Sequence, residues 1–415
     1  MSENEHQATD ILLPEARFFV FSNDKDTLLS TAELQKDWRF ARVEVKAEAG
    51  DVDTAIEAFK EQDSPDLLII QTDEIDDAFI ERLGELSNYC DEGTSAVIIG
   101  PVNDVYLYRE LIDMGVSDYL VRPIKPEVLM DVVSKTLISQ LGLSDSRLIA
   151  FVGAKGGVGT SSLAQIAAYT SSETLGHKTF LMDGCDGWSS LSVGVGFDPS
   201  ATLHEISRAV ETDNEDALNR MFHDATDKLT VLASGAGAML DPFVKQEQIE
   251  SILDNLMVKY PVLCFDLSGV DPIIKQTVMA RAHQTVIVTT PTVTSLRFCR
   301  SMMKELSELK GGEAVDLSLV VNMAGVSKAH EVDESALKEA LEFEPTVTIP
   351  YMPSAFLRNE SGISNMLDDK EASSAVHAMK KIIKTVVSGD GDPENEGNSS
   401  NSGIIGGILS KLSSK

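Results

Sequence analysis

The segment 152–162 reads VGAKGGVGTSS and combines glycines, a lysine and three small hydroxyl side chains. It stands between an apolar run at 148–152 and a helical stretch of small residues. A glycine-rich turn between a strand and a helix exposes consecutive backbone N–H groups, which bind phosphate oxygens. In the general pattern GxxxxGK[ST], a lysine precedes the hydroxyl residue. Here Thr160 takes the place of that lysine, Ser161 follows it, and Lys155 lies near the start of the loop. The segment therefore predicts a phosphate site with an altered distribution of charge.

Carboxylates follow two of the predicted buried strands. The strand TFLMD ends at Asp183, with Cys185 and Asp186 shortly after it, and PVLCFD ends at Asp266. A carboxylate at the end of a strand next to a phosphate loop holds Mg²⁺, usually through water. We expect Ser161 and Asp266 to serve this metal and expect no other metal site.

The order of strand, KGGVG, Ser/Thr pair and helix resembles the deviant phosphate loop of the ParA/MinD ATPases, KGGxGK[ST][ST]. The resemblance implies ATP and Mg²⁺ as ligands and makes Lys155 the signature lysine of the family. It implies that Asn322, in LVVNMAG, hydrogen-bonds the adenine. The loop residues that it assigns to the nucleotide are Lys155, Gly156, Gly157, Val158, Gly159, Thr160, Ser161 and Ser162.

Two positions depart from the family pattern and bear on hydrolysis. Thr160 cannot bring the positive charge that a lysine carries to the β- and γ-phosphates. In the family a DxD sequence follows this strand, with Asp183 as its first aspartate and the second orienting the attacking water. Cys185 occupies the second place and Asp186 comes one position later. Either the site is impaired in hydrolysis, the interpretation that we prefer, or Asp186 takes over. The candidate catalytic residues are Lys155, Asp183, Asp186 and Asp266, and the sequence leaves open whether the protein is a weak ATPase.

The N-terminal part alternates short apolar strands with amphipathic helices, which predicts a parallel sheet covered on both faces. The expected strands are 17–22, 66–71, 95–100 and 118–121. The sequence MGVSDYLVRPIKPEVL resembles the end of a response-regulator receiver domain. Gln71 stands where receivers carry the phosphoacceptor aspartate, and an amide forms no acyl phosphate. Asp24 is the one acidic residue after the first strand, Asp73 is two positions past the acceptor place, and Arg122 replaces the receiver lysine. We interpret this part as a docking domain that is not phosphorylated.

A second series of strands follows the phosphate loop and predicts a larger, doubly wound sheet. The expected strands are 179–182, 229–232, 262–265, 284–289, 317–321 and 346–349. The predicted fold class is α/β, with a flavodoxin-like, receiver-like domain followed by a P-loop ATPase domain of ParA/MinD type. The predicted segments are a disordered N-terminus (1–14), the receiver-like domain (15–142), the ATPase domain (146–387), a flexible acidic linker (388–403) and a short amphipathic tail (404–415).

A receiver-like domain without its acceptor, in front of such an ATPase domain, resembles the TadZ/CpaE proteins of Tad (Flp) pilus assembly over residues 15–387. The resemblance implies a homodimer formed around ATP, a position at the cell pole and recruitment of the pilus secretion machinery. One alternative is a positioning ATPase in partitioning or cell division, which Thr160 and Cys185 oppose. The other is a response regulator with an ATPase output, which Gln71 opposes.

The net charge of −31 disfavours nucleic acid as a partner. Nonspecific DNA binding depends on Lys and Arg neutralising phosphates, so we expect no sequence-specific nucleic-acid partner either. No apolar run approaches the ~20 residues of a membrane span, and the acidic start is unlike a secretory signal. We expect a cytoplasmic protein at the pole or at the periphery of the inner membrane. The tail places apolar residues of 404–412 on one helix face, which fits weak, dimer-dependent membrane or partner contact. Plain disorder of the tail is the alternative.

Overall fold

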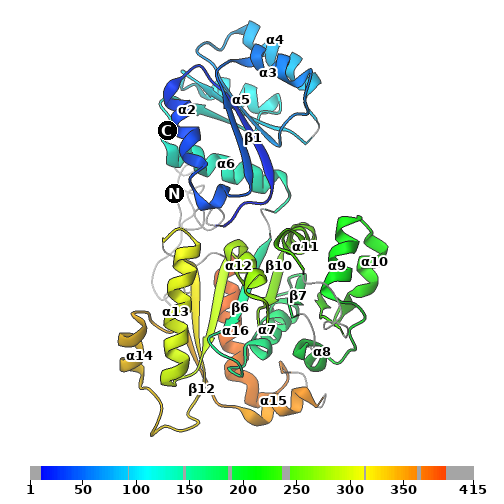
Figure 1. The fold of residues 1–415 in the computed structure, drawn as a ribbon, viewed down its shortest axis with the longest axis vertical. Helices are drawn as coiled ribbons and strands as arrows, with labels where there is room; N and C mark the ends of the chain where they lie inside the picture. Colours follow the sequence, from blue (N-terminus) through cyan, green and yellow to red (C-terminus); the bar gives the residue numbers. More distant parts are fainter. Residues whose placement is uncertain are drawn as a thin grey trace, which may run out of the picture.

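The computed structural model describes residues 11–91, 93–143, 146–185, 189–235, 244–312, 315–361 and 366–388. Two sheets, each with helices packed on it, are stacked along the long axis of the molecule (Figure 1). The linker from 389 onward, the amphipathic tail and residues 1–10 lie outside the described residues, so the predictions for them stay predictions. Within the described part, none of the helices combines the length and the apolarity needed to cross a bilayer.

The N-terminal sheet is fully parallel, with the order β2-β1-β3-β4-β5. This is the flavodoxin-like order, as predicted. The strands are β1 (Ala16–Phe21), β2 (Val43–Glu48), β3 (Leu67–Gln71), β4 (Ser95–Gly100) and β5 (Asp118–Val121). The helices are α2 (Lys25–Leu34), α3 (Val52–Phe59), α4 (Asp77–Leu86), α5 (Val105–Asp113) and α6 (Pro126–Gln140).

Aspartates define where four of these helices begin. The residue before each helix accepts hydrogen bonds from backbone N–H groups of the first turn, which otherwise lack partners. These caps are Asp24, Asp51, Asp76 and Asp104. Strand β2 was not predicted, because its sequence VEVKAE carries charges and exposes most of its side chains at the edge of the sheet.

The second sheet has eight strands in the order β13-β12-β11-β6-β10-β7-β9-β8. All pairs are parallel except β8 with β9. The strands are β6 (Arg147–Gly153), β7 (Thr179–Asp183), β8 (His223–Asp224), β9 (Leu229–Leu232), β10 (Val262–Asp266), β11 (Gln284–Thr289), β12 (Leu317–Ala324) and β13 (Val347–Pro350). The six strands expected after β6 are present, and the two-residue β8 is an addition.

Alternation along the strands assigns the helices to the two faces of this sheet. Leu148 and Ala150 of β6 join the core that contains α11 (Gln246–Lys259), α12 (Pro272–Arg281) and α13 (Val293–Leu309). Ile149 and Phe151 join the core of α7 (Thr160–Tyr169) and α16 (Ser373–Ser388). The remaining helices are α8 (Ser190–Val195), α9 (Leu203–Glu211), α10 (Glu215–Met221), α14 (Glu334–Leu341) and α15 (Pro353–Glu360).

The start of the described chain joins the two domains, which corrects one prediction. We expected residues 1–14 to be disordered, but Ile11 and Leu13 are almost fully buried. The backbone N–H of Leu12 donates to Ala280 O (3.1 Å) at the end of α12. Apolar side chains that leave water stabilise an ordered segment even at a chain terminus. One apolar core therefore continues from the N-terminal domain into the second domain.

An ion pair reinforces this junction. Arg42 Nε lies 2.7 Å from Glu250 Oε2 on α11, and the two side chains are 13% and 3% exposed. The junction involves α11 and the end of α12, where the chain turns into β11. The phosphate loop follows the opposite, carboxyl end of β6. The N-terminal domain therefore leaves the predicted phosphate site uncovered.

Candidate functional site

The predicted phosphate loop connects the central strand β6 to α7. Gly157 and Gly159 have φ angles of +74° and +91°, in the left-handed region that favours glycine. Gly159 is the N-cap of α7. A Cβ placed on Gly159 would lie 2.5 Å from Asn322 Nδ2, so a side chain there would also collide. The loop thus places its backbone at the start of a helix, where N–H groups attract anions.

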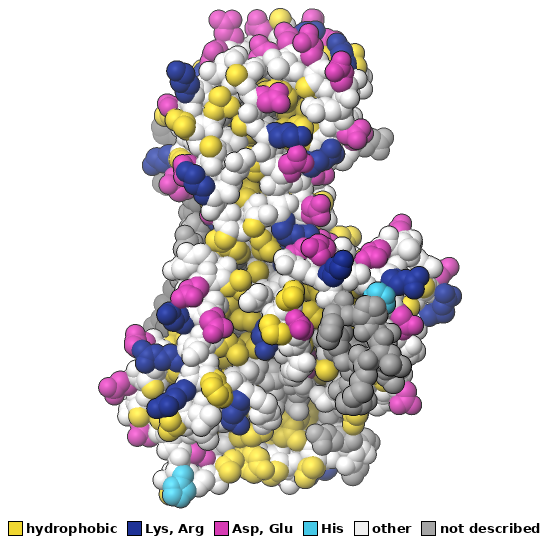
Figure 2. All heavy atoms as spheres, in the orientation of Figure 1, with side chains coloured by type: hydrophobic (Ala, Val, Ile, Leu, Met, Phe, Trp, Pro, Cys, Tyr) yellow, Lys and Arg dark blue, Asp and Glu magenta, His cyan; other side chains and the backbone are white. Residues whose placement is uncertain are grey.

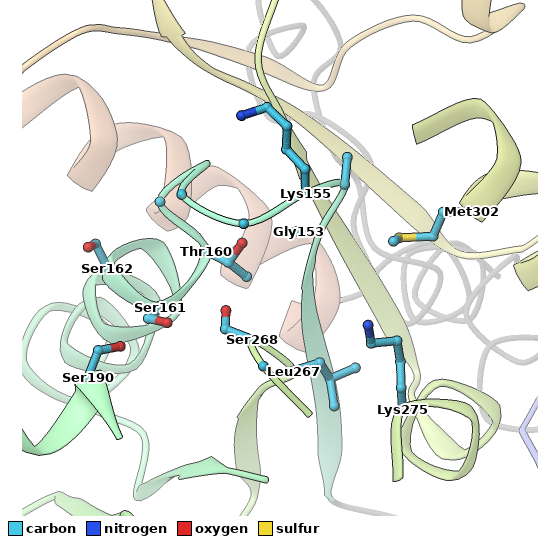
Figure 3. A pocket seen from close by; sticks show the side chains of 15 residues that line it. Gly153, Lys155, Thr160, Ser161, Ser162, Ser190, Leu267, Ser268, Lys275 and Met302 are labelled. Carbon is cyan, nitrogen blue, oxygen red and sulfur yellow. The ribbon is translucent and has the colours of Figure 1, made fainter. Parts of the chain in front are cut away.

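The loop borders a pocket of about 470 Å³ (Figure 3). Residues 153–157 and 159–162 form one wall, and Ser190, residues 267–269, Lys275 and Met302 complete the lining. Among the described residues, Lys155 and Lys275 are the ionisable groups of this lining, and no carboxylate contributes to it. Backbone dipoles and two ammonium groups favour a negatively charged ligand.

Asp266 and Ser161 come together beside the pocket, as the metal prediction requires. Asp266 ends β10, is 2% exposed and accepts a hydrogen bond from the Ser268 N–H (3.0 Å). Burial raises the pKa of Asp266, while hydrogen bonds from the Ser161 and Ser268 hydroxyls act in the opposite direction. A hydroxyl and a carboxylate next to a phosphate loop fit the oxygen preference of Mg²⁺. These two residues would hold the ion, which would neutralise phosphate charge.

Asp183 ends β7 opposite Asp266 of the neighbouring strand β10 and is not part of the pocket lining. Its side chain is 3% exposed and accepts hydrogen bonds from the Ser189 hydroxyl and from the Ser234 N–H (3.2 Å). Burial raises the pKa of Asp183 to about 6; the hydrogen bonds from Ser189 and Ser234 oppose this rise, and the nearby charge of Asp266 adds to it. Asp183 is therefore a carboxyl group that holds its proton to a higher pH than an exposed aspartate does.

Asn322 is turned to the phosphate loop and is not part of the pocket lining, so its predicted contact with adenine stays a prediction. Its side chain is completely buried, and Nδ2 donates to Val158 O in the phosphate loop (2.8 Å). Its Oδ1 is buried without a hydrogen-bond partner among the described residues. The family pattern suggested an adenine contact, but the packing of β12 behind the loop directs the amide to the loop backbone. Asn322 supports the loop in this structure.

Thr160 and Cys185, the two residues that depart from the family pattern, both lie at the pocket. Thr160 lines the pocket, but its side chain is only 5% exposed and Oγ1 packs against Gly153. Cys185 is half-buried and lies next to Gly269, one of the pocket residues. Asp186 lies outside the described residues, so its role in catalysis stays a prediction.

Lys275 is a pocket residue that was not predicted from the sequence. This residue lies on α12 and reaches the pocket from the wall opposite the phosphate loop. A single lysine on a helix is ordinary, so its own sequence neighbourhood carries no signal. The missing lysine at position 160 was the one hint that a cation has to come from elsewhere.

The N-terminal domain shows no phosphoacceptor geometry among its described residues. Gln71 is 2% exposed; its Oε1 accepts from Ser22 Oγ (3.1 Å) and its Nε2 donates to Asp73 (3.0 Å). Asp73 also pairs with Arg122 (2.8 Å), and Asp24 caps α2. In the part of the chain that the structure describes, no group of three His, Cys, Asp or Glu side chains is arranged for a metal.

Together, the parallel sheet, the glycine loop after its central strand and the buried carboxylate of the neighbouring strand define a P-loop ATPase fold of ParA/MinD type. A ParA family ATPase from Chlorobium tepidum has a similar structure, with a TM-score of 0.51 and 19% identity, over 56% of this chain and 98% of that chain. At this identity the likeness shows the fold alone.

Two further structures are similar over parts of the chain. The septum site-determining protein MinD from Pyrococcus horikoshii, complexed with Mg-ADP, gives a TM-score of 0.49 at 18% identity, over 58% of this chain and 96% of that chain. A pilus assembly protein CpaE from Caulobacter crescentus is 28% identical over 30% of this chain and 94% of that chain, with a TM-score of 0.29. Comparisons with protein-family models and with curated proteins found no match.

Proposed function

We propose that this protein binds ATP with Mg²⁺ and acts as a scaffold for Tad (Flp) pilus assembly. In this proposal it dimerises through its ATPase domain at the cell pole and recruits the secretion machinery there. The observation that carries ATP binding is the pocket itself, which offers loop amides and two lysines to phosphate and no carboxylate from the described residues. The assignment to pilus assembly rests on the sequence resemblance.

The orientation of Lys155 supports the dimer. In Figure 3 its ammonium group points away from Ser161 and Ser268. A lysine that extends outward from the loop can reach the phosphates of a second copy. Apolar side chains also gather at the lower end of the face in Figure 2, where α15 lies. Tyr351, shortly before α15, is 47% exposed, and Leu357 on α15 is 62% exposed. Exposed apolar surface near the nucleotide favours association.

Several features support slow turnover. Position 160 brings no charge, and a thiol at Cys185 is a poor group for orienting water. Asp183 is engaged by hydrogen bonds from Ser189 and Ser234 and does not line the pocket. We propose that ATP binding, with little hydrolysis, controls assembly of the dimer.

The N-terminal domain is proposed to dock partners without being phosphorylated. Gln71 fills the acceptor position, and the neighbouring Asp73 is engaged by Arg122. Acidic side chains are frequent at the upper end of this domain in Figure 2. That surface favours a protein partner over nucleic acid.

Titration of the full-length protein with ATP and Mg²⁺ tests the central claim. Binding should be measurable while phosphate release stays very low, and absence of binding at millimolar ATP would refute it. Lys155→Ala should weaken ATP-dependent dimerisation, followed by analytical ultracentrifugation, more than it weakens nucleotide affinity of the monomer. Lys36→Ala, which changes a side chain 70% exposed in the N-terminal domain, is the matched control. An unchanged dimerisation constant for Lys155→Ala would remove the dimer from the proposal.

A fluorescent fusion of the full chain tests the cellular role. Foci at the pole should appear for the wild type and disperse for Lys155→Ala. A diffuse wild-type signal would contradict the polar scaffold and leave ATP binding standing.

A further inference from the structure

Lys275 is the second cation of the pocket and belongs to no motif. It lies in the first half of α12, is half-buried and contributes to the pocket lining. Figure 3 shows its side chain rising from α12 with the ammonium group toward the pocket. Among the described residues, no carboxylate forms an ion pair with it. An ammonium group in this position is available to an anion that enters the pocket.

The fold explains why α12 brings a lysine to this place. Ile274 and Val278, one helical turn apart, are fully buried in the core and fix the rotation of the helix. Lys275 lies beside this buried face, at the border between core and pocket. The chain between β10 and α12 lines the same pocket through residues 267–269. Gly269, with a φ of +68°, allows the turn that leads into α12. The segment after Asp266 therefore supplies both a wall of the pocket and its cation.

The phosphate loop lacks one positive charge, and this absence suggests a role for Lys275. A phosphate loop usually places a lysine at position 160, where this chain has a nearly buried threonine. Lys155 borders the pocket, but in Figure 3 its ammonium group extends away from Ser268 and Ser161, so it does not take the place of the usual loop lysine beside them. A lysine is a compact point charge with three donors on a flexible stem, so it can reach phosphate oxygens from the opposite wall.

We propose that Lys275 supplies, from α12, the phosphate-binding charge that the loop lacks at Thr160. Its Nζ donates to terminal phosphate oxygens of the bound nucleotide, which makes it a determinant of selectivity for triphosphates. This inference rests on the proposed binding of ATP. It predicts that affinity depends on Lys275 more strongly for ATP than for ADP, and not at all for adenosine.

Calorimetric titration of the full-length protein tests the proposal, with ATP, ADP and adenosine as probes in the presence of Mg²⁺. Lys275→Ala should weaken ATP binding by about 10- to 100-fold, the usual effect of losing a hydrogen bond to a charged group. Lys275→Gln, which keeps most of the side chain, should lose a similar factor, whereas Lys275→Arg should retain most of the affinity. Lys304→Ala, on α13 and 78% exposed, is the matched control and should bind like the wild type.

A second arm asks whether Lys275 replaces the missing lysine of the loop. Thr160→Lys should restore much of the ATP affinity lost in Lys275→Ala, because it returns the cation to the usual position. If the wild type binds ATP and both neutral variants bind it equally well, the assignment of Lys275 is wrong and the proposed function stands. If the wild type binds no nucleotide, the assignment of Lys275 and the proposed function are both wrong. Equal losses for ATP and adenosine would show a general change in the pocket and would overturn the assignment to phosphate.

Discussion

The most quantitative prediction concerns Asp183, because its environment sets a pH dependence of stability. Its carboxyl group is 3% exposed, and burial raises its pKa from the usual 3.8 to about 6. In the unfolded chain the group ionises at its usual pKa, whereas in the folded protein it stays protonated until about pH 6. The unfolded chain therefore binds fewer protons between these values, and the stability that comes from the neutral form falls as the pH rises.

The size of the effect follows from the two pKa values. One pKa unit is worth about 1.4 kcal/mol, so the gap between 3.8 and about 6 corresponds to about 3 kcal/mol. This stability is fully present below about pH 4 and is lost above about pH 6. Asp183→Asn removes the titration and keeps the shape, and the Ser189 hydroxyl can rotate to accept from the new amide. The variant should therefore gain about 3 kcal/mol relative to the wild type between about pH 4 and about pH 7.

Urea unfolding followed by circular dichroism, at both pH values, measures this difference. Because the variant and the wild type share all other titrating groups, the contribution of those groups cancels in the difference between the two free energies of unfolding. Asp198→Asn changes an exposed aspartate and serves as the control that should show no such gain. Parallel pH profiles for Asp183→Asn and the wild type would refute the argument that burial disfavours the charge of Asp183.

Further changes test other parts of the molecule. Asn322→Ala leaves a buried carbonyl of the phosphate loop unpaired and should lower the free energy of unfolding by about 1–3 kcal/mol in urea; no change would mean that the amide does not support the loop. Acetyl phosphate should leave no phosphoaspartate detectable by mass spectrometry in the N-terminal domain, because Gln71 occupies the acceptor position. Glu250→Gln should leave Arg42 with only the exposed carboxylate of Glu15, 3.8 Å away, and speed proteolysis at the domain junction. An unchanged rate would contradict that role. The full chain should pellet with anionic liposomes more than a 1–388 truncation does; equal pelleting would leave the tail without a membrane role.

Much of the fold could be predicted because its strands are continuous apolar runs. The structure has β4 and β5 at the residues expected from the sequence. Strand β2 was not predicted, because its charged side chains resemble a loop and its backbone partners come only from β1. The buried start of the chain was not predicted either, since the partners of residues 11–13 are distant in the sequence, such as Arg39 and Ala280.

The candidate site also contains residues that the sequence predicts and residues that it does not. The loop and Asp266 follow from local patterns, in which a strand, a turn and a helix succeed one another along the chain. The position of Asn322 depends on how β12 packs, and its partner Val158 lies 164 positions away. Lys275 depends on the rotation of α12 against the sheet. Such cross-chain contacts arise from tertiary packing, which a single sequence does not display.

Helix α12 touches both the pocket and the junction between the domains. Lys275 lies in its first half, and the carbonyl of Ala280, near its end, accepts the N–H of Leu12. A ten-residue helix is about 15 Å long and moves as a stiff rod. A phosphate held by Lys275, as proposed, would therefore act on the helix that also carries the contact with Leu12. One helix thus connects the proposed nucleotide site to the segment on which the N-terminal domain rests, and this connection involves no phosphorylated aspartate.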